Sequence, residues 1–126
     1  MSDDAKKIFG QNLSFLLDRR GKNQIDVARD LDVATGTVSE WVRGKKYPRV
    51  DKMQALSEYL GVRMSILIEK NGIDTFKREE TEERLLRAFR LSSPEIQSAA
   101  MTMLENSAAE NIKKKRRTIG NITYIL

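Results

Sequence analysis

The chain has 126 residues, 40% of them hydrophobic and 33% charged, which is typical of one helix-rich domain or a small domain with an appendage. Its net charge of +5 favours a polyanionic partner, with nucleic acid ahead of an anionic membrane. The absence of cysteine and histidine excludes disulfides, thiolate catalysis and histidine-based acid–base chemistry. The sequence has no signal-peptide pattern and no long apolar run, so we expect a cytoplasmic protein without a membrane partner, and its basic charge favours association with the nucleoid. Since it has neither cysteine nor histidine, we also expect no metal and no cofactor.

Residues 1–70 carry the spacing of five short helices that share one core. The helices are expected from Asp3 or Asp4 (as cap) to Arg20, from Gln24 to Leu31, from Thr35 to Arg43, from after Pro48 to Leu60, and from Met64 to Ile68. Gly21, Gly44 and Gly61 are the expected helix stops. The side chains expected to be buried are Phe9, Leu13, Leu16, Leu17, Ile25, Ala28, Leu31, Val38, Trp41, Val42, Met53, Leu56, Tyr59, Leu60, Met64, Leu67 and Ile68.

The rest of the chain divides into three further segments. The turn signal Asn71-Gly72 opens a polar stretch, and we interpret residues 71–79 as a hinge. Residues 80–112 are expected to form two helices, the second with Ser93 as its N-cap and Pro94 in the first helical position. Residues 113–126 form a basic and β-prone tail. The expected fold class is therefore all-α.

The second and third helices are short and are joined by only a few residues, which is a helix-turn-helix arrangement. Asn23 and Gln24 begin the first of the pair, where side-chain amides and free backbone N–H groups can reach phosphate oxygens. In the second, the apolar residues face inward, which leaves small and polar side chains facing outward.

A specific resemblance covers about half of the chain. Residues from about Phe9 to Leu67 resemble the phage Cro/C1-repressor type of helix-turn-helix domain, a family of bacterial and phage regulators. The matching residues are Leu13, Leu16, Gln24, Val27, Ala28, Leu31, Val38, Ser39, Trp41, Gly44, Lys45, Pro48, Leu56, Leu60, Gly61, Val62 and Leu67. The resemblance implies a five-helix, lambda-repressor-like DNA-binding domain, followed here by a short helical dimerisation region.

The resemblance also implies that the third helix lies in the major groove of double-stranded DNA. The family's base-contact positions correspond to Thr35, Gly36 and Glu40, with Thr37 and Ser39 alongside. Glu40 could accept from a cytosine amino group, and the threonine methyls could contact thymine methyls. Gly36 departs from the usual long polar residue. It either allows the backbone to approach DNA closely or is a tolerated weak residue in the first turn.

Phosphate contacts are expected from Asn23, Gln24, Arg43, Lys45, Lys46 and Arg49. Taken alone, Lys45 and Lys46 are more simply interpreted as a solvated turn, and their position after the third helix favours phosphate contacts instead. A second departure concerns an arginine–glutamate pair that many members of the family bury. Its positions are Leu17 and Val42 here, so both charges are exchanged for apolar residues together.

Domains of this type usually act as two-fold dimers. Ile96, Ala99, Ala100, Met103 and Leu104 form an apolar stripe that is expected to pair two chains, although it could also fold back on the preceding helix. Lys113 to Arg117 could add non-specific attraction to DNA or simply end a helix in solvent, and residues 122–126 could add a strand or fray.

These features predict a non-enzymatic, sequence-specific transcriptional repressor of phage or prophage origin that binds a palindromic operator as a homodimer. The alternative is an antitoxin-type interaction module, in which the C-terminal helices bind a partner protein and the helix-turn-helix serves autoregulation. An antirepressor or other protein partner is possible under either reading.

Overall fold

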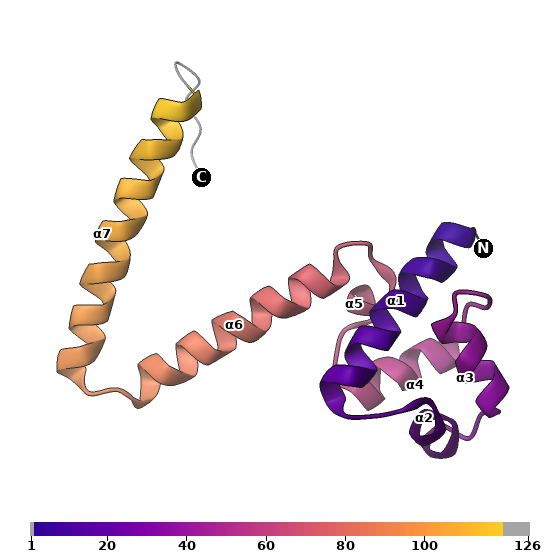
Figure 1. The fold of residues 1–126 in the computed structure, drawn as a ribbon. Helices are drawn as coiled ribbons and strands as arrows, with labels where there is room; N and C mark the ends of the chain where they lie inside the picture. The colour runs from indigo at the N-terminus through magenta and orange to yellow at the C-terminus, as the bar shows by residue number, and fades with distance from the viewer. Residues whose placement is uncertain (1, 120–126) are drawn as a thin grey trace. The chain divides into compact units, whose positions relative to one another are not determined.

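The computed structural model describes residues 2–119, and within that range the chain consists of seven helices and no strands (Figure 1). The helices are α1 (Asp3–Arg20), α2 (Gln24–Asp30), α3 (Thr35–Val42), α4 (Val50–Leu60), α5 (Met64–Ile68), α6 (Gly72–Leu91) and α7 (Pro94–Ile119). The all-α class is confirmed, and the first five helices lie where the periodicity places them. The chain divides into two units between Glu80 and Thr81.

The core of the first unit forms around α1, which packs against α3, α4 and α5. The buried hydrophobic residues are Phe9, Leu13, Leu16, Leu17, Val27, Ala28, Val38, Trp41, Met53, Leu56, Leu60, Ile66, Leu67 and Phe76. Most of them were expected from helical spacing. Asn12 is also buried, and its amide Nδ2 donates to the Ile66, Leu67 and Glu69 carbonyls at 3.1, 3.1 and 2.9 Å. These bonds satisfy the free carbonyls at the end of α5 and join it to α1.

Two residues expected in the core are exposed. Ile25 is 66% exposed and Ile68 is 41% exposed. In α2 the buried side chains are Val27 and Ala28, so the inward face is centred on these two residues and Ile25 lies outside it. Sequence spacing in a seven-residue helix fits two faces almost equally well, because it spans fewer than two complete turns.

The first helix is capped by Ser2 rather than by an aspartate. Ser2 Oγ accepts from the Ala5 backbone N–H at 3.2 Å, and Asp3 and Asp4 lie in the first turn. Carboxylates in a first turn are favoured by the helix dipole. At the other end, Gly21 adopts the left-handed conformation with φ 66°, which confirms the expected stop.

Residues 72–79 are helical, where an irregular hinge was expected. α6 begins at Gly72, eight residues before the predicted start near Glu80. A side chain at position 72 would overlap the Ile66 carbonyl, so glycine lets the first turn of α6 lie against α5. Phe76 then reaches the core, with its ring edge-on to Phe15 at a centroid distance of 6.1 Å.

The charged residues of this stretch have partners within the first unit. The guanidinium of Arg63 donates twice to the Glu79 carboxylate, at 2.7 and 3.1 Å. Arg19 forms an ion pair with Glu80 at 2.9 Å. The polar composition that predicted a hinge therefore reflects ion pairing on the surface of a folded unit.

In the second unit, α7 begins as predicted, with Ser93 Oγ accepting from the Ile96 backbone N–H at 3.3 Å. Gln97 Nε2 donates to the Phe89 carbonyl at 2.7 Å and joins the two helices. α7 continues to Ile119, beyond the predicted helical limit at residue 112, so Lys113–Arg117 end a helix in solvent, which is one of the two expectations for this run. The predicted β-prone residues 122–126 lie outside the described range. None of the described helices is both long enough and apolar enough to cross a membrane.

Candidate nucleic-acid interface

The beginning of α2 is fixed by a reciprocal capping box. Asn23 Oδ1 accepts from the Asp26 backbone N–H at 2.8 Å, and Asp26 Oδ2 accepts from the Asn23 N–H at 2.9 Å. A short connection then leads to α3. Within this connection the Val33 N–H donates to the Ala28 carbonyl at 3.0 Å. The predicted N-cap is confirmed, and the two helices form the expected helix-turn-helix.

α1 holds α3 from behind. A Cβ added to Gly10 would lie 2.7 Å from the carbonyl oxygens of both Trp41 and Val42, so glycine lets α1 contact the end of α3 directly. Val38 and Trp41 are buried on that inward side. Because α3 is anchored by this face, its opposite face is fixed toward solvent.

The outer face of α3 is open where the base-contact positions were expected. Thr35 and Gly36 are exposed, and Thr37, Ser39 and Glu40 are half-buried. A Cβ at Gly36 would meet no atom within 4 Å, so packing inside the protein does not require glycine there. The described chain leaves this surface available for another molecule.

The charged side chains at the end of α3 are held by neighbours. Arg43 Nε donates to Ser39 Oγ at 3.2 Å, which keeps the guanidinium beside the outer face. Lys46 Nζ lies 3.4 Å from Glu40 Oε1. Sequence reasoning identified these residues separately and missed both pairings. The Glu40–Lys46 pair depends on the turn that brings residue 46 back toward residue 40, whereas Ser39 and Arg43 are four residues apart on one helical face.

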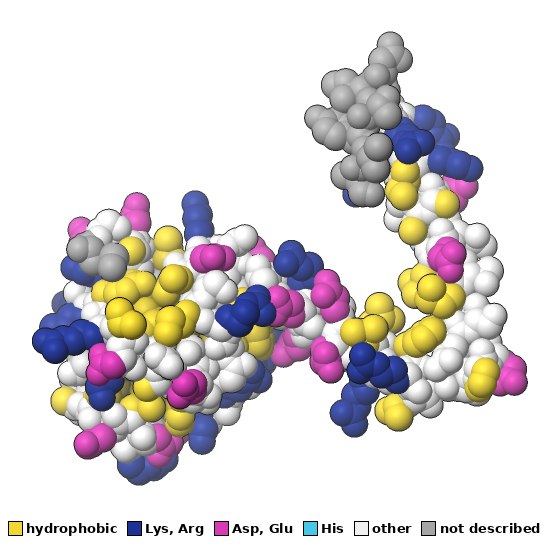
Figure 2. Space-filling model, turned by 180° about the vertical axis from the view of Figure 1, so that it is seen from behind, with side chains coloured by type: hydrophobic (Ala, Val, Ile, Leu, Met, Phe, Trp, Pro, Cys, Tyr) yellow, Lys and Arg dark blue, Asp and Glu magenta, His cyan; other side chains and the backbone are white. Residues whose placement is uncertain are grey.

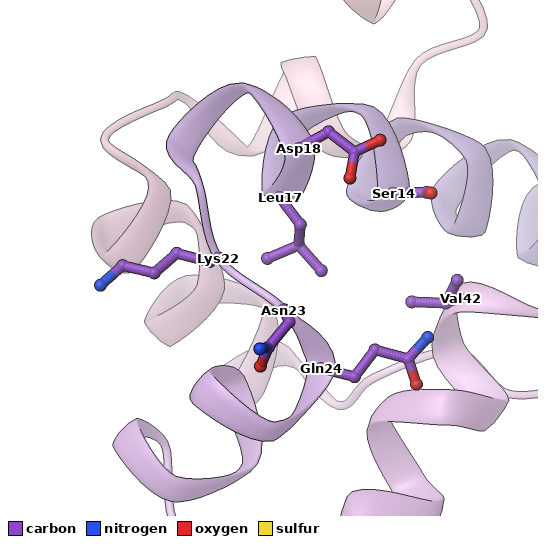
Figure 3. A pocket seen from close by; sticks show the side chains of 7 residues that line it. All are labelled: Ser14, Leu17, Asp18, Lys22, Asn23, Gln24 and Val42. Atoms are coloured by element: carbon purple, nitrogen blue, oxygen red, sulfur yellow. The ribbon is translucent and has the colours of Figure 1, made fainter.

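Asn23 and Gln24 lie at a surface pocket between α1, α2 and α3. The pocket is lined by Ser14, Leu17, Asp18, Lys22, Asn23, Gln24 and Val42 (Figure 3). Gln24 extends toward Val42, whereas Lys22 points away from the pocket (Figure 3). Leu17 and Val42 line the same pocket, as expected of two positions that exchange a buried ion pair for apolar side chains.

The remaining predicted phosphate contacts lie after α3. Lys45 and Lys46 are exposed in the turn, and Arg49 occupies the N-cap position of α4 without a side-chain cap bond. Thr37, Lys46 and Arg49 line one shallow opening between α3 and α4. The structure thus places the predicted cations of this turn around the outer edge of α3.

Two further residues, Lys7 and Tyr47, lie next to this turn. A Cβ at Gly44 would lie 3.1 Å from the Cα of Lys7, so α1 brings an additional exposed lysine to the turn after α3. No sequence spacing links residues 7 and 44. Tyr47 packs on the body of the domain with its ring 5.5 Å from that of Phe9, and burial raises its pKa.

The predicted pairing residues lie in the second unit on α7. Ile96, Met103 and Leu104 are 58%, 73% and 49% exposed. Ala99 is exposed and Ala100 half-buried. Figure 2 shows hydrophobic side chains at the surface of the helices after residue 80. The stripe is therefore largely uncovered by the described part of its own chain.

Comparison with known proteins agrees with this geometry. Residues 14–67 match a helix-turn-helix family model, HTH_3. The chain is 27% identical over 117 residues to a 26 kDa repressor protein of Escherichia phage HK022, covering 86% of this chain and about half (48%) of that relative. A solution structure of the SOS-response transcriptional repressor LexA from Eubacterium rectale is 35% identical with a TM-score of 0.51, covering 55% of this chain and 73% of that one.

Proposed function

Because residues 14–67 form a helix-turn-helix domain of the Cro/C1 type, a family of DNA-binding regulators rather than enzymes, we propose that the protein is a sequence-specific repressor of transcription. Its ligand is double-stranded DNA, with α3 in the major groove. The similarity to a phage repressor supports an origin in a phage or prophage.

The observation that carries this proposal is the uncovered outer face of α3. Thr35 and Gly36 stand exposed at its beginning, and Glu40 and Arg43 flank its end. Small side chains at the beginning of α3 let its backbone approach base edges closely, and the longer polar side chains farther along can reach the donors and acceptors displayed there. α3 has this distribution on the face opposite its buried anchor.

The cations around this face suit the phosphate backbone. Arg43, Lys45 and Arg49 lie between the end of α3 and the beginning of α4, and Lys7 adjoins the same turn. Asn23 and Gln24 offer amide donors from α2. Such contacts fix the register of a protein on DNA and carry no sequence information of their own.

The repressor acts as a two-fold dimer on a palindromic operator. One domain reads only half a site, and the exposed stripe on α7 gives a second copy an apolar surface to cover. Pairing there would hold two α3 helices roughly 34 Å apart, or farther, as half-site spacing on DNA requires.

Selection of bound sites from random duplex DNA tests this function. We expect an enriched inverted repeat that Thr35→Glu binds at least about tenfold more weakly, because a carboxylate then faces the groove. Gln54→Glu also adds a carboxylate, at an exposed position on α4 away from α3, and as the control it should bind normally. Absence of any enriched sequence would refute the proposal.

The exposed leucines of α6 give specific support to one alternative. Leu85 and Leu91 are 52% and 77% exposed, and such a surface could bind a different protein while the helix-turn-helix serves autoregulation. Sedimentation of the purified chain distinguishes the two: a homodimer favours the repressor, whereas a monomer that co-purifies with a defined partner favours the interaction module.

A further inference from the structure

Glu40 and Lys46 form a paired unit at the end of α3. Their charged atoms lie 3.4 Å apart, with the two side chains 32% and 59% exposed. The backbone reinforces this pairing, because the Lys45 and Lys46 N–H groups both donate to the Glu40 carbonyl, at 2.9 and 3.3 Å. Residue 46 is thereby folded back over residue 40, so that both side chains leave the same end of the helix.

An unpaired carboxylate on this face would oppose DNA binding. A glutamate that approaches phosphates meets like charge, and the cost grows as water is displaced from the groove. Lys46 cancels that charge where it arises. The ion pair therefore lets a negatively charged side chain enter the groove. A lysine that contacted a distant phosphate instead would leave the glutamate charge uncompensated.

The two charged atoms match the edge of one base pair. In the major groove a C·G pair displays the cytosine N4 donor beside the guanine O6 acceptor, and the guanine N7 acceptor lies next to O6. Cytosine N4 donates a hydrogen bond to guanine O6 within the pair, which separates the two atoms by roughly 3 Å. This spacing is close to the 3.4 Å between Glu40 Oε1 and Lys46 Nζ.

We propose that Glu40 and Lys46 together read a single C·G base pair, a role that rests on the DNA-binding function proposed above. Glu40 accepts from cytosine N4, and Lys46 donates to guanine O6 and N7. Lys46 is thus a specificity-determining residue rather than a phosphate contact. An A·T pair also shows a donor beside an acceptor, but thymine offers Lys46 one acceptor where guanine offers two, with a methyl group beside it.

The test compares five proteins on one selected operator. All four base pairs are placed in turn at each half-site position, and binding is measured for the unaltered chain, Glu40→Gln, Lys46→Met, the double variant of these two, and Lys45→Met. Lys45 is the matched control, since it is an exposed lysine of the same turn. Thermal unfolding of each variant verifies that the domain stays folded.

The unaltered protein should prefer C·G at one position by roughly 5- to 150-fold. Glu40→Gln and Lys46→Met should both lose the preference at that same position, and the double variant should lose little more than either alone. Lys45→Met should instead weaken every sequence alike and reduce the slope of log K against log salt by about 0.9.

Replacing that guanine by 7-deazaguanine isolates the lysine contact. The modified operator lacks N7, so it should weaken binding of the unaltered protein and leave Lys46→Met unaffected. The inference is overturned if Lys46→Met behaves like Lys45→Met, if the two variants change different positions, or if the preferred pair is A·T. Each of these results leaves sequence-specific binding intact, whereas failure to select any operator would refute the proposed function itself.

Discussion

Residues 2–80 and residues 81–119 are both helical, but they differ in how their apolar side chains are covered. Among the described residues, the 14 buried hydrophobic side chains all lie between Phe9 and Phe76. Seven of the ten large hydrophobic residues that remain exposed lie between Leu85 and Leu104. The same periodicity of leucine, methionine and isoleucine therefore forms a core in one unit and an open surface in the other.

This difference assigns different physical roles to the two units. The first contains enough long-range packing to hold α3 by itself, through Gly10, Val38 and Trp41. In the second, helices that bury so little gain most of their stability from whatever covers them. We infer that association stabilises the second unit, while recognition belongs to the first.

The sharpest test of this comparison makes one chemical change in each unit. Leu13 is fully buried, so Leu13→Ala should lower the free energy of unfolding of the first unit by about 2–5 kcal/mol. Leu104→Ala is the matched change in the second unit and should leave that value unchanged. The measurement is urea unfolding followed by the fluorescence of Trp41, the single tryptophan of the chain. Equal losses would contradict independence of the units.

The second prediction concerns the α7 stripe. Met103→Lys should weaken self-association by about 1.5–3 kcal/mol for each copy, because burial of the methionine is lost. Operator binding should weaken as the dimer dissociates, and unfolding of the first unit should not change. Met101→Lys is the control, because residues 101 and 103 point to opposite sides of a helix. Sedimentation of both variants is the measurement, and a Met103→Lys dimer would place the interface elsewhere.

Asn12 provides a smaller effect confined to the first unit. Asn12→Ala leaves the carbonyls of Ile66, Leu67 and Glu69 without their buried donor, at an expected cost of about 1–3 kcal/mol. Gln11→Ala alters the exposed neighbour and should cost far less. Hydrogen exchange at the end of α5 should accelerate in the first variant. Unchanged exchange would show that water replaces the amide without penalty.

Local signals determined much of this fold, and tertiary partners determined the rest. Asn23, Ser93 and Gly21 mark helix ends through bonds within a few residues, so sequence could place them. The start of α6 could not be placed in this way. Its charged residues look like a hinge until Arg63 and Arg19 are known to lie beside Glu79 and Glu80.

The candidate site shows the same division. The positions of Thr35 and Gly36 on the outer face follow from helical spacing against Val38 and Trp41. The Glu40–Lys46 pair does not, because it depends on side-chain conformations and on a turn around Gly44, which has φ 71°. Sequence identified the helix that faces outward, and the structure was needed to show which of its charges act together.

The smallest expected effect comes from the bond between α2 and α4. Tyr59 Oη donates to Asp30 Oδ2 at 2.6 Å. Burial, and then this hydrogen bond, raise the pKa of Tyr59 to about 12 from its ordinary 10.0. The pKa of Asp30 is lowered from its ordinary 3.8, first by the bond from Tyr59 and then by that from Arg29.

These shifts define the pH range in which the bond stabilises the fold. Because the pKa of Tyr59 is raised, its contribution to the stability of the folded state is complete below pH 10.0 and is lost as pH rises toward 12. Because the pKa of Asp30 is lowered, its contribution to that stability is present above pH 3.8 and is lost as pH falls below that value. Tyr59→Phe should therefore destabilise the first unit most between these limits, and by less than Asn12→Ala because the bond is exposed. Urea unfolding across this range measures the difference between the two proteins. A difference that stays constant through both limits would mean that the hydroxyl stabilises the unit without its bond to the Asp30 carboxylate.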